Sequence, residues 1–191
     1  MTDDVAEAAG LASLTQSVVL VGLMGVGKTA VGKRLAAQIG LPFVDADHEI
    51  EAAAGMTVSE IFATCGEAGF RSGERRVIAR LIDGPPRVIS TGGGAFVDPE
   101  TRALVKARAI SVWLVAEIDE LVRRTQRRNN RPLLATGDPR EILTRLSEAR
   151  APCYAEADIH VASSRGPVEE TVHRVLLALT LHLDQHPHAR G

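Results

Sequence analysis

Residues 22–29, Gly-Leu-Met-Gly-Val-Gly-Lys-Thr, have the types and spacing that bind a polyphosphate. They match the phosphate-binding loop G-x-x-x-x-G-K-[ST]. The glycines accept positive φ angles and let backbone N–H groups approach phosphate oxygens closely. Lys28 supplies an ammonium for the β- and γ-phosphates, and Thr29 supplies a hydroxyl for Mg²⁺. The alternative is an ordinary glycine-rich turn between a strand and a helix, which the Gly-Lys-Thr ending disfavours.

Two carboxylates, Asp45 and Asp47, follow a short apolar segment at residues 42–44. One of them can order water around Mg²⁺. The other can accept a hydrogen bond from a substrate hydroxyl and help to remove its proton. Aspartate is also common after strands, so two solvated loop carboxylates are the alternative.

Arg71 and the run of three glycines at residues 92–94 are further candidates for binding a ligand. Arg71 lies three residues before Glu74 on a predicted helix, a spacing that lets the carboxylate orient the guanidinium. A solvated surface pair is the default interpretation of that spacing alone. Three glycines after a strand indicate that backbone approaches a ligand closely, with a plain turn as the alternative.

The segment at residues 126–137 is rich in arginine and asparagine and has no periodicity, which suits a mobile loop over a site. Its arginines are Arg127, Arg128 and Arg131. A guanidinium delivered by such a loop can neutralise charge on a transferring phosphoryl group, an effect of roughly 10³–10⁵ in rate. The alternative is a solubilising run of charge. Arg150, near the end of a predicted helix, is on its own a partner for the helix dipole.

Apolar segments alternate with helical patterns along the chain, which predicts a parallel sheet covered on both faces. Strands are expected at residues 17–21, 42–45, 86–90, 110–115 and 158–161. Helices are expected at 28–39, 57–62, 67–82, 99–106, 118–125, from 139, and at 168–179. Ligands of such sheets bind beyond the carboxyl ends of the strands. The phosphate loop, the two aspartates and the triple glycine should therefore share one cleft.

The length of 191 residues suits one α/β domain, expected at residues 16–182. Residues 1–15 are expected to be a flexible N-terminal extension and residues 183–191 a flexible tail. The net charge of −2 gives no reason to expect nucleic-acid or membrane-surface partners. Cys65 and Cys153 have no motif spacing and indicate a reducing cytoplasm. No apolar run reaches membrane-spanning length. The sequence has no long exposed apolar stripe, so a monomer is expected.

Three histidines have simple interpretations. His182 and His186 are spaced i, i+4, but they lack a second cluster of ligands, so a zinc site is disfavoured. His160 is interpreted as a structural, hydrogen-bonded histidine.

The chain resembles the shikimate kinase family over residues 18–175. The resemblance rests on an ordered set of motifs at residues 22–29, 45–51 (Asp-Ala-Asp-His-Glu-Ile-Glu), 69–71 (Gly-Phe-Arg), 91–95 (Thr-Gly-Gly-Gly-Ala), 130–134 (Asn-Arg-Pro-Leu-Leu) and 150–154 (Arg-Ala-Pro-Cys-Tyr). It implies ATP-dependent transfer of a phosphoryl group to the 3-hydroxyl of shikimate, in aromatic amino-acid biosynthesis. It also implies a three-layer α/β/α P-loop fold with sheet order 2-3-1-4-5, a helical substrate-binding insert at residues 46–83 and a lid at 126–138.

The resemblance also implies roles for individual residues. The ATP contacts it implies are Gly25, Val26, Gly27, Lys28, Thr29, Ala30, Arg124 near the adenine, and Arg131 on the phosphates. The shikimate contacts are Asp47, Arg71, Gly93 and Arg150, and the Mg²⁺ contacts are Thr29 and, through water, Asp45. The catalytic residues are Lys28, Asp45, Asp47 and Arg131. The physical chemistry agrees, because two guanidiniums can grip a carboxylate through fork geometry while Asp47 accepts from hydroxyls.

Two departures from the family pattern are visible. Ala30 follows Thr29 where many members carry a second hydroxyl residue. Residues 163–167 are hard to align, which leaves the second adenine contact open, with Arg165 as one candidate.

Two rival functions stay open. One is a gluconate kinase of the same architecture, whose acceptor is also a carboxylate with hydroxyls. The other is a regulatory nucleotide-binding module, which would be expected to lack Asp47, Arg71 or Arg131.

Overall fold

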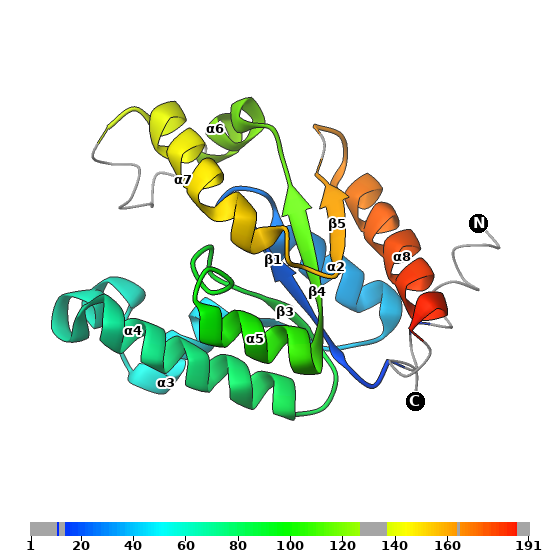
Figure 1. The fold of residues 1–191 in the computed structure, drawn as a ribbon, viewed down its shortest axis with the longest axis horizontal. Helices are drawn as coiled ribbons and strands as arrows, with labels where there is room; N and C mark the ends of the chain where they lie inside the picture. Colours follow the sequence, from blue (N-terminus) through cyan, green and yellow to red (C-terminus); the bar gives the residue numbers. More distant parts are fainter. Residues whose placement is uncertain (1–10, 12–13, 127–136, 164, 187–191) are drawn as a thin grey trace.

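Five parallel strands lie at the centre of the computed structural model, which describes residues 11, 14–126, 137–163 and 165–186. The strands are β1 (Ser17–Val21), β2 (Phe43–Asp45), β3 (Val88–Ser90), β4 (Ala109–Val115) and β5 (Ile159–Ala162). Their order across the sheet is β2-β3-β1-β4-β5, as predicted (Figure 1). All neighbouring strands are parallel, with Val18 opposite both Val88 of β3 and Ile110 of β4.

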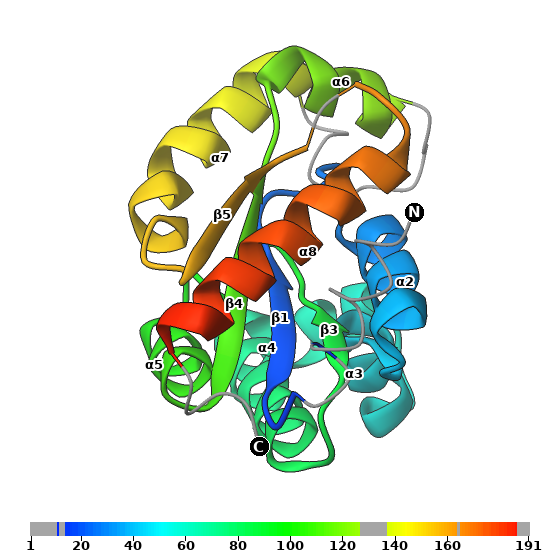
Figure 2. The same ribbon diagram turned by 90° about the vertical axis from the view of Figure 1, so that its right-hand side faces the viewer.

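Helices cover both faces of this sheet and complete the predicted three layers (Figure 2). Helices α2 (Lys28–Ile39) and α8 (Val168–Gln185) pack together on one face. On the other face α5 (Pro99–Arg108) packs against β4, and α4 (Val58–Asp83) packs against α5. α3 (Ala46–Ala54) pairs with α4, and α6 (Ile118–Gln126) pairs with α7 (Pro139–Tyr154). In the part of the chain that the structure describes, none of the helices combines the length and apolar character needed to cross a membrane.

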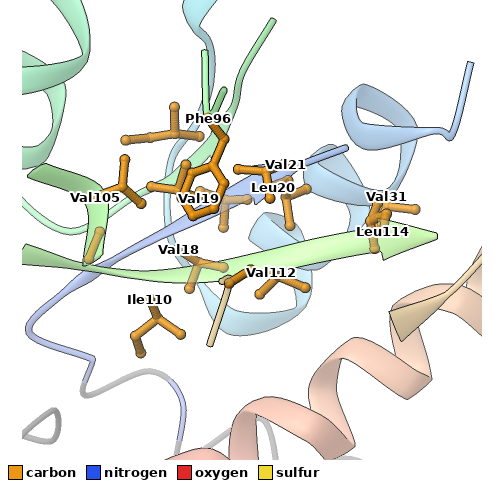
Figure 3. Packing of buried hydrophobic residues seen from close by; sticks show 14 of the residues in the cluster. Val18, Val19, Leu20, Val21, Val31, Phe96, Val105, Ile110, Val112 and Leu114 are labelled. Carbon is orange, nitrogen blue, oxygen red and sulfur yellow. The ribbon is translucent and has the colours of Figure 1, made fainter. Parts of the chain in front are cut away.

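The core is built around β1, all of whose residues are buried. A parallel strand covered by helices on both faces is apolar along its whole length, which explains the run Val18-Val19-Leu20-Val21. Figure 3 shows these side chains packed among those of neighbouring elements, including Phe96 and Val105. This burial fixes the strand that leads directly into the phosphate loop.

The local signals at the helix starts have the predicted effects. Thr57 and Glu60 form the expected capping box at the start of α4. Asp98 and Asp138 cap α5 and α7, each followed by a proline in the first turn. The two helices expected in α4 form one element with a break at Gly66, whose φ of 67° lies in the left-handed region.

Two terminal predictions differ from the structure. α8 continues to Gln185, and Leu183 is buried against the core, so the expected tail does not begin at residue 183. Leu183 lies one helical turn beyond Leu179 and extends the same buried stripe. Leu11 and Leu14 are also buried, so the end of the expected N-terminal extension packs on the domain. Each apolar side chain gains about 1.5–3 kcal/mol from such burial.

Candidate active site

A cleft of about 510 Å³ opens beyond the carboxyl ends of the strands. It is lined by the phosphate loop, the end of β2, the triple glycine, α6 and the residues around the start of α8. The predicted site residues among its lining are Gly25, Val26, Gly27, Lys28, Thr29, Ala30, Asp45, Asp47, Gly93 and Arg124. Arg71 and Arg150 do not line this space themselves, but each reaches the triple glycine at its edge. Arg127, Arg128 and Arg131 lie outside the described residues.

The phosphate loop has the backbone that its sequence predicts. Gly22, Gly25 and Gly27 have φ angles of 131°, 82° and 104°. The Lys28 ammonium donates to the carbonyl oxygens of Gly22 (2.7 Å) and Leu23 (2.9 Å), and Lys28 is only 8% exposed. The loop thus holds the Lys28 ammonium against its own backbone carbonyls at the N-terminus of α2. The partial positive charge of a helix N-terminus favours the binding of an anion there.

Thr29 and Asp45 place two hydrogen-bonded side-chain oxygens beside this loop. The Thr29 hydroxyl donates to Oδ2 of Asp45 at 3.0 Å. The other oxygen of Asp45 accepts from the backbone N–H of Asp47 at 3.2 Å, which caps α3. Asp45 is therefore fixed by two hydrogen bonds, which excludes a freely solvated loop carboxylate.

Asp47 is the second residue of α3, and it lines the same cleft. Burial raises its pKa above the ordinary aspartate value, and the negative charge of Asp45 raises it further. The positive charge of Lys28 opposes both effects. A β-carbon placed on Gly92 would lie 2.8 Å from Oδ1 of Asp47, so the first glycine of the triplet lies directly against this carboxylate. Such a partly desolvated carboxylate is suited to accept a proton.

Arg71 is held by Glu74, as their spacing predicts, and this partner is buried. Nη1 of Arg71 lies 2.5 Å from Oε2 of Glu74, which is 1% exposed. Burial raises the pKa of Glu74, while the charge and hydrogen bond of Arg71 lower it. Oε1 of Glu74 has no hydrogen-bond partner among the described residues. The default interpretation, a solvated surface pair, is therefore wrong.

Gly94 lies so close to Arg71 that a side chain cannot be added without moving the guanidinium. A β-carbon at Gly94 would overlap Nη2, Nη1 and Cζ of Arg71. Because Glu74 anchors that guanidinium, we expect Gly94→Ala to raise KM for the acceptor about tenfold, with KM for ATP unchanged. Steady-state kinetics with each substrate varied in turn measure both constants.

The matched control for that substitution is Gly73→Ala, also in the region of Arg71. A β-carbon at Gly73 would meet nothing within 4 Å. It should leave both KM values unchanged. Equal behaviour of the two variants would show that Arg71 is not constrained by the third glycine.

Arg150 contacts the triple glycine from the other side. Its Nη1 donates to the carbonyl oxygen of Gly93 at 3.1 Å, and the hydroxyl of Tyr154 donates to the same oxygen. Arg150 is therefore more than a partner for the dipole of its own helix. Tyr154 is a contact that the sequence motifs included without indicating any role.

Arg124 lies against the opposite end of the phosphate loop. Its Nη1 donates to the carbonyl oxygen of Val26 (2.9 Å) and to Oγ of Ser163 (3.0 Å). The hydroxyl of Ser163 also donates to the carbonyl oxygen of Val26, at 3.0 Å. These bonds connect α6 and the end of β5 to the loop. Sequence reasoning missed Ser163, which lies in the stretch that was hard to align.

Glu120 gathers three arginines at this end of the cleft. It is 2% exposed, and its carboxylate lies 2.5 Å from Arg124, 2.6 Å from Arg123 and 3.5 Å from Arg165. Hydrogen bonds from Arg123 and Arg124 outweigh burial and lower the pKa of Glu120 to about 2. The i, i+4 spacing of Glu120 and Arg124 was a signal that sequence reasoning left unused.

The family resemblance implies that Arg124 lies near the adenine, and Glu120→Gln removes the negative charge that holds Arg124 in place. We therefore expect this substitution to raise KM for ATP about tenfold and to leave KM for the acceptor unchanged. Its Tm at neutral pH should fall by about 3 °C. The pKa of Glu120 is lowered from 4.5, so its stabilisation is present above pH 4.5 and is lost as pH falls toward about 2. The Tm difference from the parent should vanish over that acid range.

Glu156→Gln is the matched control for Glu120→Gln, since Glu156 also pairs with two cations, Arg102 and Lys106. None of these three residues lines the cleft. A rise in KM for ATP in both variants would contradict the role of Glu120.

His160 has the hydrogen-bonded, structural environment that the sequence predicts. His160 bonds through Nε2 to the carbonyl oxygen of Ala157 at 3.1 Å and packs edge-on against Trp113. His182 and His186 stack on each other at the end of α8. Across the described ranges no group of three potential metal-ligating side chains of His, Cys, Asp or Glu occurs.

A phosphate loop with a Thr–Asp pair, and a half-buried aspartate beside them at the carboxyl edge of a parallel sheet, define a P-loop kinase of small molecules. Comparison with known families makes this specific. The chain belongs to the shikimate kinase family, whose model, described as "Shikimate kinase", matches residues 24–180. It is thus an enzyme of the class that phosphorylates shikimate with ATP.

Similar proteins agree with this assignment. The chain is 58% identical over 186 residues to a shikimate kinase of Paramagnetospirillum magneticum, covering 96% of this chain and 95% of that protein. A solved shikimate kinase of Acinetobacter baumannii in complex with shikimate is 37% identical with a TM-score of 0.83, covering 91% of this chain and 96% of that one. A gluconokinase of Sinorhizobium meliloti is 19% identical with a TM-score of 0.58, covering 90% and 98% of the two chains, which shows a shared fold alone.

Proposed function

We propose that the chain transfers the γ-phosphoryl group of Mg²⁺-bound ATP to the 3-hydroxyl of shikimate, with Asp47 as the base. The triple glycine is the observation that carries this proposal. A β-carbon on Gly93 would lie 3.6 Å from Met24 in the phosphate loop, and its neighbours Gly92 and Gly94 lie against Asp47 and Arg71. Phosphate-binding and acceptor-binding groups therefore meet across one short loop.

The nucleotide half of the site is built from the phosphate loop and its neighbours. Backbone N–H groups of the loop and the ammonium of Lys28 would bind the phosphates, and Arg124 would lie near the adenine. Thr29 and Asp45 offer hard oxygen ligands 3.0 Å apart, a donor set that suits Mg²⁺, with Asp45 acting through water. The metal ion would neutralise charge on the β- and γ-phosphates.

The acceptor half divides shikimate between an anionic and a polar end. Arg71 and Arg150 would bind the carboxylate, and the N–H of Gly93 and the carboxylate of Asp47 would bind hydroxyls. As the 3-hydroxyl oxygen attacks the γ-phosphorus, the bond from that phosphorus to the β,γ-bridging oxygen breaks. Asp47 accepts the hydroxyl proton. Its raised pKa supports this role.

Further predictions from the sequence stay proposals. Arg131, which lies outside the described residues, would supply a further positive charge at the phosphates. The cytoplasm is the proposed location, and a monomer is the proposed state. The substrate-binding insert at residues 46–83 and the lid at 126–138 are proposed on the same footing.

The deciding experiment measures ADP production from Mg-ATP with shikimate, with gluconate and without an acceptor. Turnover that depends on shikimate supports the proposal. Turnover with gluconate alone would keep the kinase chemistry but contradict the acceptor. ATP binding without turnover on either acid would favour a regulatory nucleotide-binding protein.

A further inference from the structure

Tyr154 is a buried polar side chain close to the proposed acceptor-binding groups. The proposed chemistry gives it no role. It is 1% exposed and lies in the last turn of α7. Its ring packs against Trp113 of β4, with centroids 5.8 Å apart. Burial raises the pKa of its hydroxyl, while the nearby charge of Arg150 opposes that rise. The hydroxyl is thus protonated at neutral pH and able to donate.

The hydroxyl of Tyr154 donates to the carbonyl oxygen of Gly93, which also accepts from Arg150 at 3.1 Å. The other two carbonyl oxygens of the triplet accept backbone bonds within their own loop. Gly92 accepts from Ala95 at 3.2 Å, and Gly94 accepts from Val97 at 3.1 Å. The middle carbonyl is therefore the one that α7 controls.

Fixing this carbonyl fixes a whole peptide unit. The peptide bond is planar and trans, so the N–H of Gly94 points opposite to the carbonyl of Gly93. This unit lies between the phosphate loop, where Gly93 approaches Gly22 and Met24, and the guanidinium of Arg71 beside Gly94. A glycine pair has no side chain to restrict its backbone, so the two donors from α7 supply the restriction.

We propose that Tyr154 is a positioning residue for the acceptor: with Arg150 it clamps the Gly93 carbonyl and so sets the spacing between the phosphate loop and the acceptor-binding groups. The inference rests on the proposed function, since the acceptor is taken to be shikimate. Tyr154 is not among the residues that line the cleft, so it acts through the backbone of Gly93 and the side chain of Arg150. A hydroxyl at this position therefore matters for acceptor affinity and not for nucleotide affinity.

The test is Tyr154→Phe, which removes the hydroxyl and keeps the ring on Trp113. We expect KM for shikimate to rise about fivefold to tenfold while KM for ATP changes by less than about twofold, the effect of one lost hydrogen bond. Ser111→Ala is the matched control. The buried Ser111 hydroxyl of β4 donates to the carboxylate of Asp158, just before β5, at 2.5 Å. That variant should lower Tm without separating the two KM values.

Two further measurements locate the effect at Gly93. In the nucleotide-free protein the carbonyl ¹³C resonance of Gly93 should shift in Tyr154→Phe and not in Ser111→Ala. In a double-mutant cycle with Arg150→Lys, the combined rise in KM for shikimate should be smaller than the product of the single rises, because both donors share one oxygen.

The possible results separate the inference from the function. If the parent protein turns over shikimate but Tyr154→Phe leaves its KM unchanged, or raises both KM values equally, the positioning role is wrong and the function stands. If the parent protein does not phosphorylate shikimate, the proposed function fails and the inference fails with it. A selective rise in KM for shikimate with a shifted Gly93 resonance supports both.

Discussion

Asp47→Asn should lower kcat with shikimate about 10²–10⁴-fold, because the amide cannot accept the proton of the attacking hydroxyl. The amide still accepts and donates hydrogen bonds, so shikimate binding should weaken far less than turnover. Asn also keeps the volume of the side chain beside Gly92, so the fold should be retained. Pre-steady-state kinetics and a direct binding measurement with shikimate separate the two effects.

The same carboxylate should set the acid limb of the pH profile. Burial raises the pKa of Asp47, so a larger fraction is protonated at mildly acidic pH than for an exposed aspartate. A protonated carboxyl cannot act as the base. The parent's kcat/KM should therefore fall as pH falls through this raised pKa, and the acid limb should disappear from the residual activity of Asp47→Asn.

Asp119→Asn is the control for this experiment. Asp119 is an exposed aspartate that forms an ion pair with Arg140, outside the residues that line the cleft. Its loss should leave kcat and the pH profile unchanged. If Asp47→Asn kept near-parental turnover with normal shikimate binding, the base role would be wrong.

Arg71→Lys should raise KM for shikimate about 10–100-fold, with KM for ATP unchanged. Lysine retains the positive charge but loses the planar fork that can bind a carboxylate through two parallel bonds. Its ammonium can still pair with Glu74, so the buried carboxylate is not left without a cation. The loss should therefore fall on acceptor binding more than on Tm.

Arg80→Lys is the matched control, because Arg80 is on the same helix and pairs with Glu49 on the surface. With 61% of its side chain exposed, that pair contributes little and its geometry matters little. Arg80→Lys should behave like the parent in both KM values and in Tm. A rise in KM for ATP that matches the rise for shikimate in Arg71→Lys would contradict the acceptor role.

Much of this arrangement could be predicted from sequence because it depends on local patterns. The phosphate loop is a continuous motif, and β1 is recognisable by its unbroken apolar run. The partnership of Arg71 with Glu74 follows from helical spacing, although its burial does not, since a helix pattern alone does not show which neighbour covers that face. The strand order came from the family resemblance, not from the alternation of elements.

Contacts between distant residues could not be predicted. Tyr154 and Gly93 are 61 positions apart, and only the folded chain shows that they share a hydrogen bond. The overlap of Gly94 with Arg71 is likewise a matter of tertiary packing. The end of α8 is a different case: Leu183 continues the spacing of Leu179, so the helical periodicity itself predicts that the buried stripe extends to this residue.

The central place of β1 in the sheet has a consequence for how such a protein can change over generations. Strands β2 and β3 lead to Asp47 and the triple glycine on one side of it, while α6 and α7, which carry Arg124 and Arg150, lie between β4 and β5 in the chain. Under the proposed roles, mutations in α4 around Arg71 can alter acceptor binding while the phosphate loop is preserved. The phosphate loop and the triple glycine, where the proposed binding groups for the two substrates meet, are exposed to selection for both substrates at once.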